Sequence, residues 1–440
     1  MNRATSPATE DDSDGDNGYD YDPAIPLSSI ENSKTIQLSL RASYTNWEPR
    51  EAFRELVQNW RDGIIKSFNL AESDFRVVRK ESITSRLGGD TDIVYKVTPF
   101  NHDSDAIDSV AEDDWLGFMR FTANHDEGVV EITNRAATLQ TSHLDLGGTS
   151  KTDDASQAGA HGEGLKVALL VLMRGGQNHA VRCCSGQFNW HFNFSTSGRL
   201  VARLDRMSHQ AISKAKSKAR LSMGKTLLPF MPRPRKDVQF VIGERGKGRD
   251  QNGTMVTRHP VKRSEFDAWT HAALFLHPTG QNGEGIISTI NGDLLTDREF
   301  SGRIYLKGLL LLESTPTRSA SITNLPLKFG YNFASGLTNR ERQSLAGAKE
   351  EANAILAIWS KVLVSKPKMV SGLSSMLNSA DPQSADVFRA KDHMGYDTAI
   401  KLRDYLIEEF DGKWYYSSEE KSEVIPLIPT IDSNLCPHLC

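Results

Sequence analysis

The chain has 440 residues, of which 38% are hydrophobic and 25% are charged, and its formal net charge is −4. This length allows two or three domains with separate cores, and the composition is that of an ordinary globular protein. The near-neutral charge indicates no particular partner, and the absence of a run of about 18 apolar residues argues against a membrane span. The polar, acidic start argues against a signal peptide, so we expect an intracellular protein, cytoplasmic or nuclear.

The four cysteines are two adjacent residues, Cys183 and Cys184, and two near the end, Cys436 and Cys440. This is no disulfide framework, and it favours a reducing compartment. With His438, the last two cysteines offer three soft metal ligands, but close residues at a free end are more often a plain tail.

Periodicity predicts the elements in chain order. Residues 1–35 are acidic and contain little that could be buried, which predicts a disordered acidic tail. Alternation over 36–45 predicts a strand that leads into a helix starting near Pro49. Further strands are expected at 75–78, 93–97, 115–121, 129–133, 179–196, 199–206, 253–258, 286–295, 302–312 and 329–332. Further helices are expected at 142–146, 167–173, 264–276, 339–362 and within 366–418.

Two details of this pattern are specific enough to test. The strands 115–121 and 129–133 should form a hairpin whose turn lies at Gly128. The strands 179–196 and 199–206 should be joined by a turn at Ser197 and Gly198.

The helix after Pro49 has an apolar stripe and a polar stripe. At about 100° per residue, its carboxylate and amide side chains fall within an arc of roughly 60°. These side chains are Glu55, Asn59 and Asp62. Such a face can hold a hydrated magnesium ion and activate a water, because hard cations prefer oxygen ligands and a general base needs a carboxylate. The alternative is an amphipathic helix with a solvated face.

A glycine cluster precedes the apolar helix 167–173. It comprises Gly159, Gly162 and Gly164, with Glu163 and Lys166 beside them. Glycines before a helix leave bare N–H groups at the positive end of its dipole, which favours anion binding. The alternative is a flexible loop before a core helix.

Residues 208–236 form a basic insertion. Its eight cations occur without an acid and are Lys214, Lys216, Lys218, Arg220, Lys225, Arg233, Arg235 and Lys236. Such a run can contact the phosphates of a nucleic acid or serve as a nuclear import signal, but it is more often a solvated loop.

Four motifs occur in an order and spacing that resemble the nucleotide-binding boxes of the GHKL superfamily. This superfamily includes gyrase B, the ninety-kilodalton heat-shock chaperones, histidine kinases and MutL. The motifs are Glu55-x3-Asn59-x2-Asp62, residues 146–151, residues 159–166 and Gly253-Thr254. The resemblance implies a Bergerat fold, in which an antiparallel or mixed sheet is backed by helices and ATP lies under a mobile lid.

The resemblance also implies residue roles in a histidine kinase-like ATPase domain. Glu55 is similar to the general base for the attacking water, Asn59 to the magnesium ligand and Asp62 to the aspartate that orders the pocket. Thr254 resembles the residue that bonds near adenine. The lid and phosphate cradle would span 149–164 and supply Thr149, Ser150, Lys151, Gly159, Gly162, Glu163 and Gly164. Lys151 and Lys166 would add positive charge, with a solvated lid lysine as the alternative for each.

One box departs from the family pattern. Where relatives have Asp-x-Gly-x-Gly, residues 134–138 read Asn-Arg-Ala-Ala-Thr. Asn134 can accept a hydrogen bond from adenine through its amide oxygen, but it lacks the charge of the usual aspartate. The departure therefore bears on adenine preference and affinity, while the residues at the phosphate end match the pattern.

We expect an α+β fold in four parts. These are the tail 1–35, a Bergerat-fold ATP-binding sandwich at 36–260, a smaller α+β transducer-like domain at 261–365, and a helical segment with a tail at 366–440. In relatives the second domain sends a basic residue back to the γ-phosphate. The candidates here are Lys307, Arg340 and Arg342, with plain surface charge as the alternative.

The predicted function is magnesium-dependent ATP binding and hydrolysis coupled to lid and domain movement. Glu55 favours hydrolysis over kinase chemistry, and we find no phosphoacceptor helical hairpin. The alternative is a catalytically weak nucleotide-sensing or interaction module. A third hypothesis, an ATP-gated nucleic-acid clamp, rests on the basic insertion alone. A protein client of unknown kind and an ATP-dependent homodimer are the other expected partners.

Overall fold

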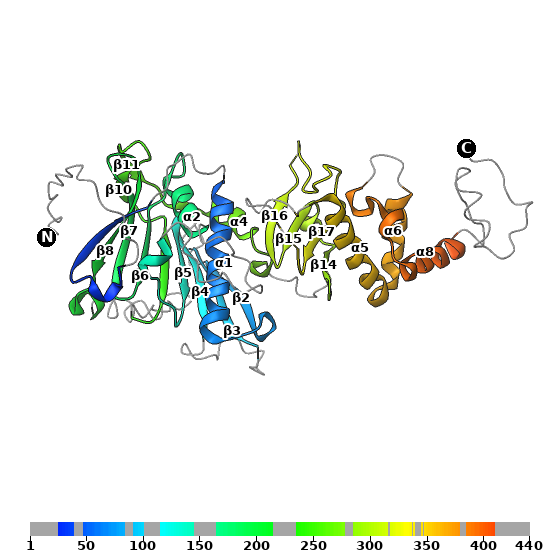
Figure 1. Ribbon diagram of the computed structural model, residues 1–440, viewed down its shortest axis with the longest axis horizontal. Coiled ribbons are helices and arrows are strands. Elements are labelled where there is room, and N and C mark those ends of the chain that lie inside the picture. The colour runs from blue at the N-terminus through cyan, green and yellow to red at the C-terminus, as the bar shows by residue number, and fades with distance from the viewer. Residues whose placement is uncertain are drawn as a thin grey trace, which may run out of the picture. The chain divides into compact units, whose positions relative to one another are not determined.

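The structure is a computed structural model that describes most of the chain. The described residues are 25–38, 47–83, 91–100, 115–144, 164–213, 235–277, 285–315, 317–336, 338, 345, 347–378 and 384–409. The chain divides into two compact units, Met1–Trp269 and Thr270–Cys440 (Figure 1). Both units mix helices and strands, which confirms the α+β class.

The first unit is built on a ten-stranded antiparallel sheet in the order β1-β8-β7-β6-β9-β5-β4-β3-β2, with β12 paired to β5. Two further strands, β10 and β11, pair with each other. The strands are β1 (Ser33–Gln37), β2 (Phe75–Ile83), β3 (Thr91–Pro99), β4 (Gly117–Asn124), β5 (Glu127–Asn134), β6 (Val181–Ser185), β7 (Phe188–Phe194), β8 (Leu200–Arg206), β9 (Val238–Ile242), β10 (Gly246–Arg249), β11 (Met255–Arg258) and β12 (Val261–Lys262).

Helix α1 (Pro49–Phe68) confirms the helix expected after Pro49. Glu48 and Glu51 form a capping box at its start, and Asn69 ends it in the left-handed conformation. The predicted apolar stripe is buried, namely Phe53, Leu56, Val57, Trp60 and Ile64. Helix α2 (Gly164–Met173) lies beside α1, and both cover one face of the sheet (Figure 1). The sequence therefore predicted both helices that line the candidate site.

The hairpin turn predicted at Gly128 was placed wrongly. The turn lies between β4 and β5 at His125, which has a φ of 58°, and Gly128 is already part of β5. A Cβ on Gly128 would lie 2.3 Å from the carbonyl oxygen of Thr122. This glycine thus permits close approach of two backbones rather than a turn.

Two other predicted elements are interrupted. The strand expected at 179–196 is two strands, because Gly186 and Gln187 adopt positive φ and turn the chain between β6 and β7. The helix expected at 264–276 ends early as α4 (Arg263–Thr270), followed by the 3₁₀ helix η7 (Leu274–Leu276). In α4, Phe266 and Trp269 pack against Phe53 of α1. The start predicted for the second domain, residue 261, falls within the first compact unit.

The second unit contains a five-stranded mixed sheet in the order β13-β14-β17-β15-β16, in which only β15 and β17 run parallel. Its strands are β13 (Ile286–Thr289), β14 (Gly292–Leu295), β15 (Arg303–Leu306), β16 (Leu309–Glu313) and β17 (Gly330–Phe333). Its α-helices are α5 (Ala348–Ser365), α6 (Val370–Leu377), α7 (Ala390–His393) and α8 (Tyr396–Glu409). The helix expected from residue 339 therefore begins at Ala348.

Short 3₁₀ helices complete the described chain. They are η1 (Leu27–Ser29), η3 (Glu72–Asp74), η6 (Thr141–Leu144), η8 (Arg298–Phe300), η9 (Pro367–Met369) and η10 (Ala385–Val387). Among the described residues, no helix combines the length and the apolarity that crossing a membrane requires.

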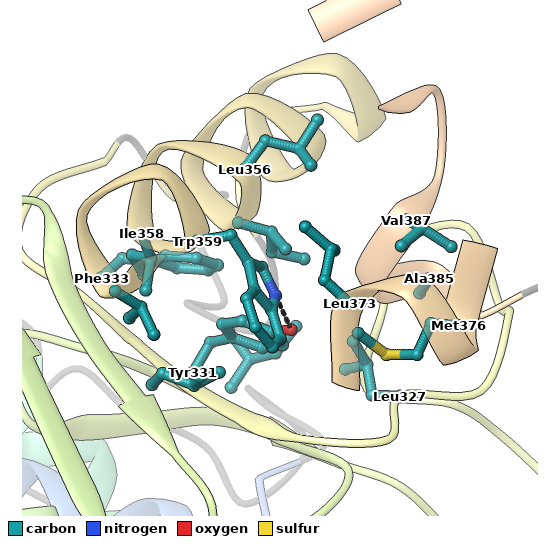
Figure 2. Packing of buried hydrophobic residues seen from close by; sticks show 14 of the residues in the cluster. Leu327, Tyr331, Phe333, Leu356, Ile358, Trp359, Leu373, Met376, Ala385 and Val387 are labelled. Carbon is teal, nitrogen blue, oxygen red and sulfur yellow. Dashed lines mark hydrogen bonds between the residues drawn. The ribbon is translucent and has the colours of Figure 1, made fainter. Parts of the chain in front are cut away.

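Trp359 of α5 is the centre of the second unit's core (Figure 2). Leu373 and Met376 of α6 belong to the same buried cluster as Trp359 and Phe333. Helix α6 thus shares one core with the sheet.

A chain of hydrogen bonds crosses this core. Trp359 Nε1 donates to Tyr331 Oη at 3.0 Å, and Tyr331 Oη donates to Asp386 Oδ1 at 2.5 Å. Asp386 is buried and also accepts from the backbone N–H of Lys328 at 2.8 Å. Burial, followed by the charge of Asp386, raises the pKa of Tyr331 well above its usual value, so its hydroxyl stays protonated and can donate.

Candidate functional site

The polar face of α1 is enclosed by protein. Glu55 is 2% exposed and Asp62 is 7% exposed, while Asn59 is half-buried. Neighbouring polar residues on the helix, Arg54 and Gln58, are buried as well. The alternative interpretation, an amphipathic helix whose polar face is solvated, therefore does not hold for α1. Burying carboxylates costs free energy unless charges or hydrogen-bond donors compensate.

The carboxylate of Glu55 lies against the first residue of α2. A Cβ added to Gly164 would lie 2.0 Å from Glu55 Oε2, which no side chain at position 164 could accommodate without movement. Gly164 begins α2, where backbone N–H groups and the helix dipole present positive potential. Arg54 Nη2 lies 4.0 Å from the other carboxylate oxygen, Oε1. Glu55 and Gly164, distant in sequence, thus lie against each other.

Lys166 lies in the first turn of α2 and is completely buried. The other residues of α2 from Val167 to Met173 are apolar and buried. For Lys166 the alternative of a solvated lid lysine is therefore wrong. The amine of Lys166 therefore lies inside the first unit, where the low local dielectric strengthens the interactions of polar groups.

Asn134 ends β5 directly beneath α1. Its Nδ2 donates to the carbonyl oxygen of Trp60 at 2.5 Å, and in return Trp60 Nε1 donates to the carbonyl oxygen of Thr133 at 2.9 Å. The amide also faces Gly63, where an added Cβ would lie 2.8 Å from Nδ2. These contacts hold α1 to the sheet. The bond to the Trp60 carbonyl oxygen needs a hydrogen-bond donor at position 134, and an ionised aspartate has none.

We expect Asn134→Asp to destabilise the first unit by about 2–3 kcal/mol. The carboxylate would face the Trp60 carbonyl oxygen without a proton to donate. Hydrogen exchange of peptides from α1 and β5, compared with the wild-type protein at each pH, measures the loss. The loss should shrink at acid pH because the protonated acid regains a donor. Asn124→Asp, at an exposed position on β4, is the control, and equal stability of the two variants would contradict this role.

The backbone after Asn134 keeps a glycine-like shape without a glycine. Ala136, at the position of the first glycine in the motif that the sequence resembles, has a φ of 53°. Its N–H donates to Asp237 Oδ1 at 3.3 Å, and Asp237 is buried. Beside it on β9, Gln239 Nε2 donates to Thr133 Oγ1 at 3.2 Å. Asp237 and Gln239 were missed from the sequence, because only the pairing of β5 with β9 brings them here.

Thr254 lies away from these residues. It is exposed in the turn before β11, where its N–H donates to Asp250 Oδ1 at 2.9 Å. In the same turn, Gln251 Oε1 accepts from the N–H of Gly175, just beyond the end of α2. At 1.5 Å of rise per residue, this end is roughly 13 Å from Gly164. The structure thus places Glu55, Gly164 and Lys166 on the two helices α1 and α2. Asn134 lies at the contact of α1 with β5. Thr254 lies at the opposite end of α2 from Gly164.

Several predicted residues lie outside the described part of the chain. They are Thr149, Ser150, Lys151, Gly159, Gly162, Glu163, Arg340 and Arg342. The same holds for the cations of the basic insertion from Lys214 to Arg233 and for the tail from Cys436 to Cys440. Lys307 is described and lies in the turn between β15 and β16 with a φ of 50°.

The two described cysteines are buried free thiols on β6. Burial raises the pKa of Cys183 well above its usual value and raises the pKa of Cys184 to about 11. Both thiols are therefore protonated at neutral pH, which excludes them as nucleophiles there.

Comparison with known proteins adds no assignment: no protein-family model matches the chain, and no curated protein matches it either.

Proposed function

We propose that the first unit binds ATP with Mg²⁺ and hydrolyses it, and that the nucleotide state is coupled to a conformational change. The observation that supports this most is the contact of the Glu55 carboxylate with Gly164 at the start of α2. It joins a candidate general base to the kind of helix terminus that binds phosphate. The choice of ATP as the ligand and of hydrolysis as the reaction rests on the order of the motifs, which resembles that of the GHKL superfamily.

The oxygen-bearing side chains of α1 are of the kinds that bind magnesium. Glu55 and Asn59 are four residues apart, so their side chains are neighbours on the helix surface. Asp62 adds a third oxygen-bearing side chain on the same side of α1. Magnesium binds few protein oxygens and keeps several waters, so one amide oxygen beside carboxylates is a sufficient protein contribution. Asn59 is the proposed direct ligand.

In the proposed reaction, each residue has a limited task. Glu55 accepts the proton of the water that attacks the γ-phosphate, and its buried carboxylate is held in place beside Gly164. Backbone N–H groups at the start of α2 hold phosphate oxygens, and Lys166 contributes positive potential from the same turn. Magnesium, when bound, neutralises charge on the phosphate oxygens. Asn134 remains bonded to Trp60 and presents its amide oxygen as the acceptor for adenine.

A second candidate function is a module that senses nucleotide but turns it over weakly. Asn134 favours it, because this residue binds α1 through its amide nitrogen and carries no charge with which to attract the adenine amino group. Contact with nucleic acid through residues 208–236 belongs to this alternative. Neutralising the cations of that insertion would remove a salt-dependent affinity for DNA or RNA if such contact exists.

The test is equilibrium binding of ATP to the full chain with Mg²⁺ and with a chelator, together with measurement of phosphate release. We expect binding that requires Mg²⁺, and slow turnover. Asn59→Ala should weaken Mg²⁺-dependent binding about 10- to 100-fold, because a contact to a charged group contributes about 1.5–3 kcal/mol.

Lys66→Ala is the matched control, since Lys66 is exposed on the same helix. It should bind ATP as the wild-type protein does. A wild-type chain that neither binds nor hydrolyses ATP would overturn the proposal, and binding without turnover would favour the sensing module.

A further inference from the structure

Two histidines and a glutamate of the second unit converge outside the nucleotide site. His271 follows α4, His277 ends η7, and Glu299 lies in η8. One ligand atom from each side chain can be chosen so that all three lie within 4.8 Å of one another. The two imidazole rings have centroids 4.8 Å apart and planes inclined at 58°. The chain thus brings three metal-ligating side chains together from three separate short segments.

The ring of His277 is held in a protected position. It meets Phe300 edge to face, with centroids 5.1 Å apart and an interplanar angle of 82°. Its Nε2 is shielded from solvent and has no hydrogen-bond partner among the described residues. A buried polar atom without a partner costs about 1–3 kcal/mol, which a metal ion bound at Nε2 would offset.

The charges around the cluster suit a cation. Glu299 supplies a negative charge. Arg303, the nearby cation, is itself paired with Glu313, with 3.5 Å between Nε and Oε2.

We propose that His271, His277 and Glu299 bind one Zn²⁺ ion, with water in the fourth position. Two imidazoles and one carboxylate favour Zn²⁺ over the oxygen-seeking Mg²⁺ of the proposed nucleotide site. Ligand atoms around tetrahedral zinc are roughly 3.3 Å apart. Closing to that spacing requires a modest movement, which Glu299 can make because it is exposed.

Bound zinc would act as a clip within the second unit. It would join the chain after α4 to η8, across the stretch 278–284 that lies outside the described residues. Because the metal binds only when these segments are together, its binding free energy stabilises the folded unit.

The test uses the full chain with Cys436→Ser and Cys440→Ser, which removes the thiols of the tail as competing ligands. Co²⁺ serves as the spectroscopic probe, followed by competition with Zn²⁺. We expect one equivalent of Co²⁺, a visible spectrum without thiolate charge-transfer bands, displacement by Zn²⁺, and a higher unfolding temperature with Zn²⁺.

Variants then assign the ligands. Glu299→Gln alters an exposed side chain, so the fold is retained, and it should lower Zn²⁺ affinity about tenfold or more, as should His271→Gln. His393→Gln is the control because His393 is also half-buried in this unit and its Nε2 lacks a hydrogen-bond partner there. Glu408→Gln controls for an exposed carboxylate.

The proposal is overturned if the chain binds no Co²⁺ or Zn²⁺ once the tail thiols are removed. It is equally overturned if Glu299→Gln and His271→Gln bind Zn²⁺ as tightly as the two control variants do. Neither result bears on ATP binding by the first unit, so the two proposals are tested separately.

Discussion

Glu55→Gln is expected to lower the turnover number for ATP about 10²- to 10⁴-fold while leaving ATP binding nearly unchanged. Glutamine has the size of glutamate and can occupy the same space beside Gly164. It cannot accept a proton from water at neutral pH, so only the chemical step is affected. Steady-state phosphate release measures the turnover number, and equilibrium titration with ATP measures the affinity.

Glu72→Gln is the matched control for this experiment. Glu72 is an exposed carboxylate that pairs with Arg61 of α1, with 2.5 Å between Oε2 and Nη2. Its replacement should leave both turnover and affinity unchanged, since exposed ion pairs contribute little. Wild-type turnover by Glu55→Gln would remove Glu55 as the base. Loss of ATP binding together with turnover would instead assign Glu55 to holding the pocket together.

Trp359→Ala is expected to destabilise the second unit by about 3–5 kcal/mol. Trp359 is completely buried, packs edge to face on Phe329 with centroids 5.5 Å apart, and donates to Tyr331 (Figure 2). Alanine leaves a cavity in this core and deprives Tyr331 of a donor. Hydrogen exchange of peptides from α5 and β17 measures the effect, because a single unfolding free energy is poorly defined for a chain of two units.

One variant at this position separates the hydrogen bond from most of the packing, and a second variant elsewhere on α5 serves as the control. Trp359→Phe keeps an aromatic ring but loses the N–H, and it should cost about 1–2 kcal/mol. Val364→Ala, an exposed position on α5, should leave exchange unchanged. Protection in α5 that survives Trp359→Ala would contradict the central position given to this residue.

The sequence predicted the local elements of the candidate site because their signals are local. The apolar stripe of α1 repeats with the helix period, and the glycines before α2 precede an unbroken apolar run. Both helices form as expected. One error lies where a glycine has a role other than turning the chain. Gly128 reads as a turn residue, yet it sits in a strand because Thr122 passes too close for a side chain.

The sequence by itself determined the α+β class, the buried stripe of α1 and the polar set on its other side. Only the tertiary structure decided that this polar set is buried, since burial depends on what packs against the helix. Helix packing brought Glu55 to Gly164, and strand pairing brought Asp237 and Gln239 beside Asn134. The contact of Asn134 with Trp60 gives the amide at this position a structural role, because the carbonyl oxygen of the helix accepts a hydrogen bond from it. Such contacts join residues far apart in the chain, and the periodicity and spacing of residues in the sequence do not predict them.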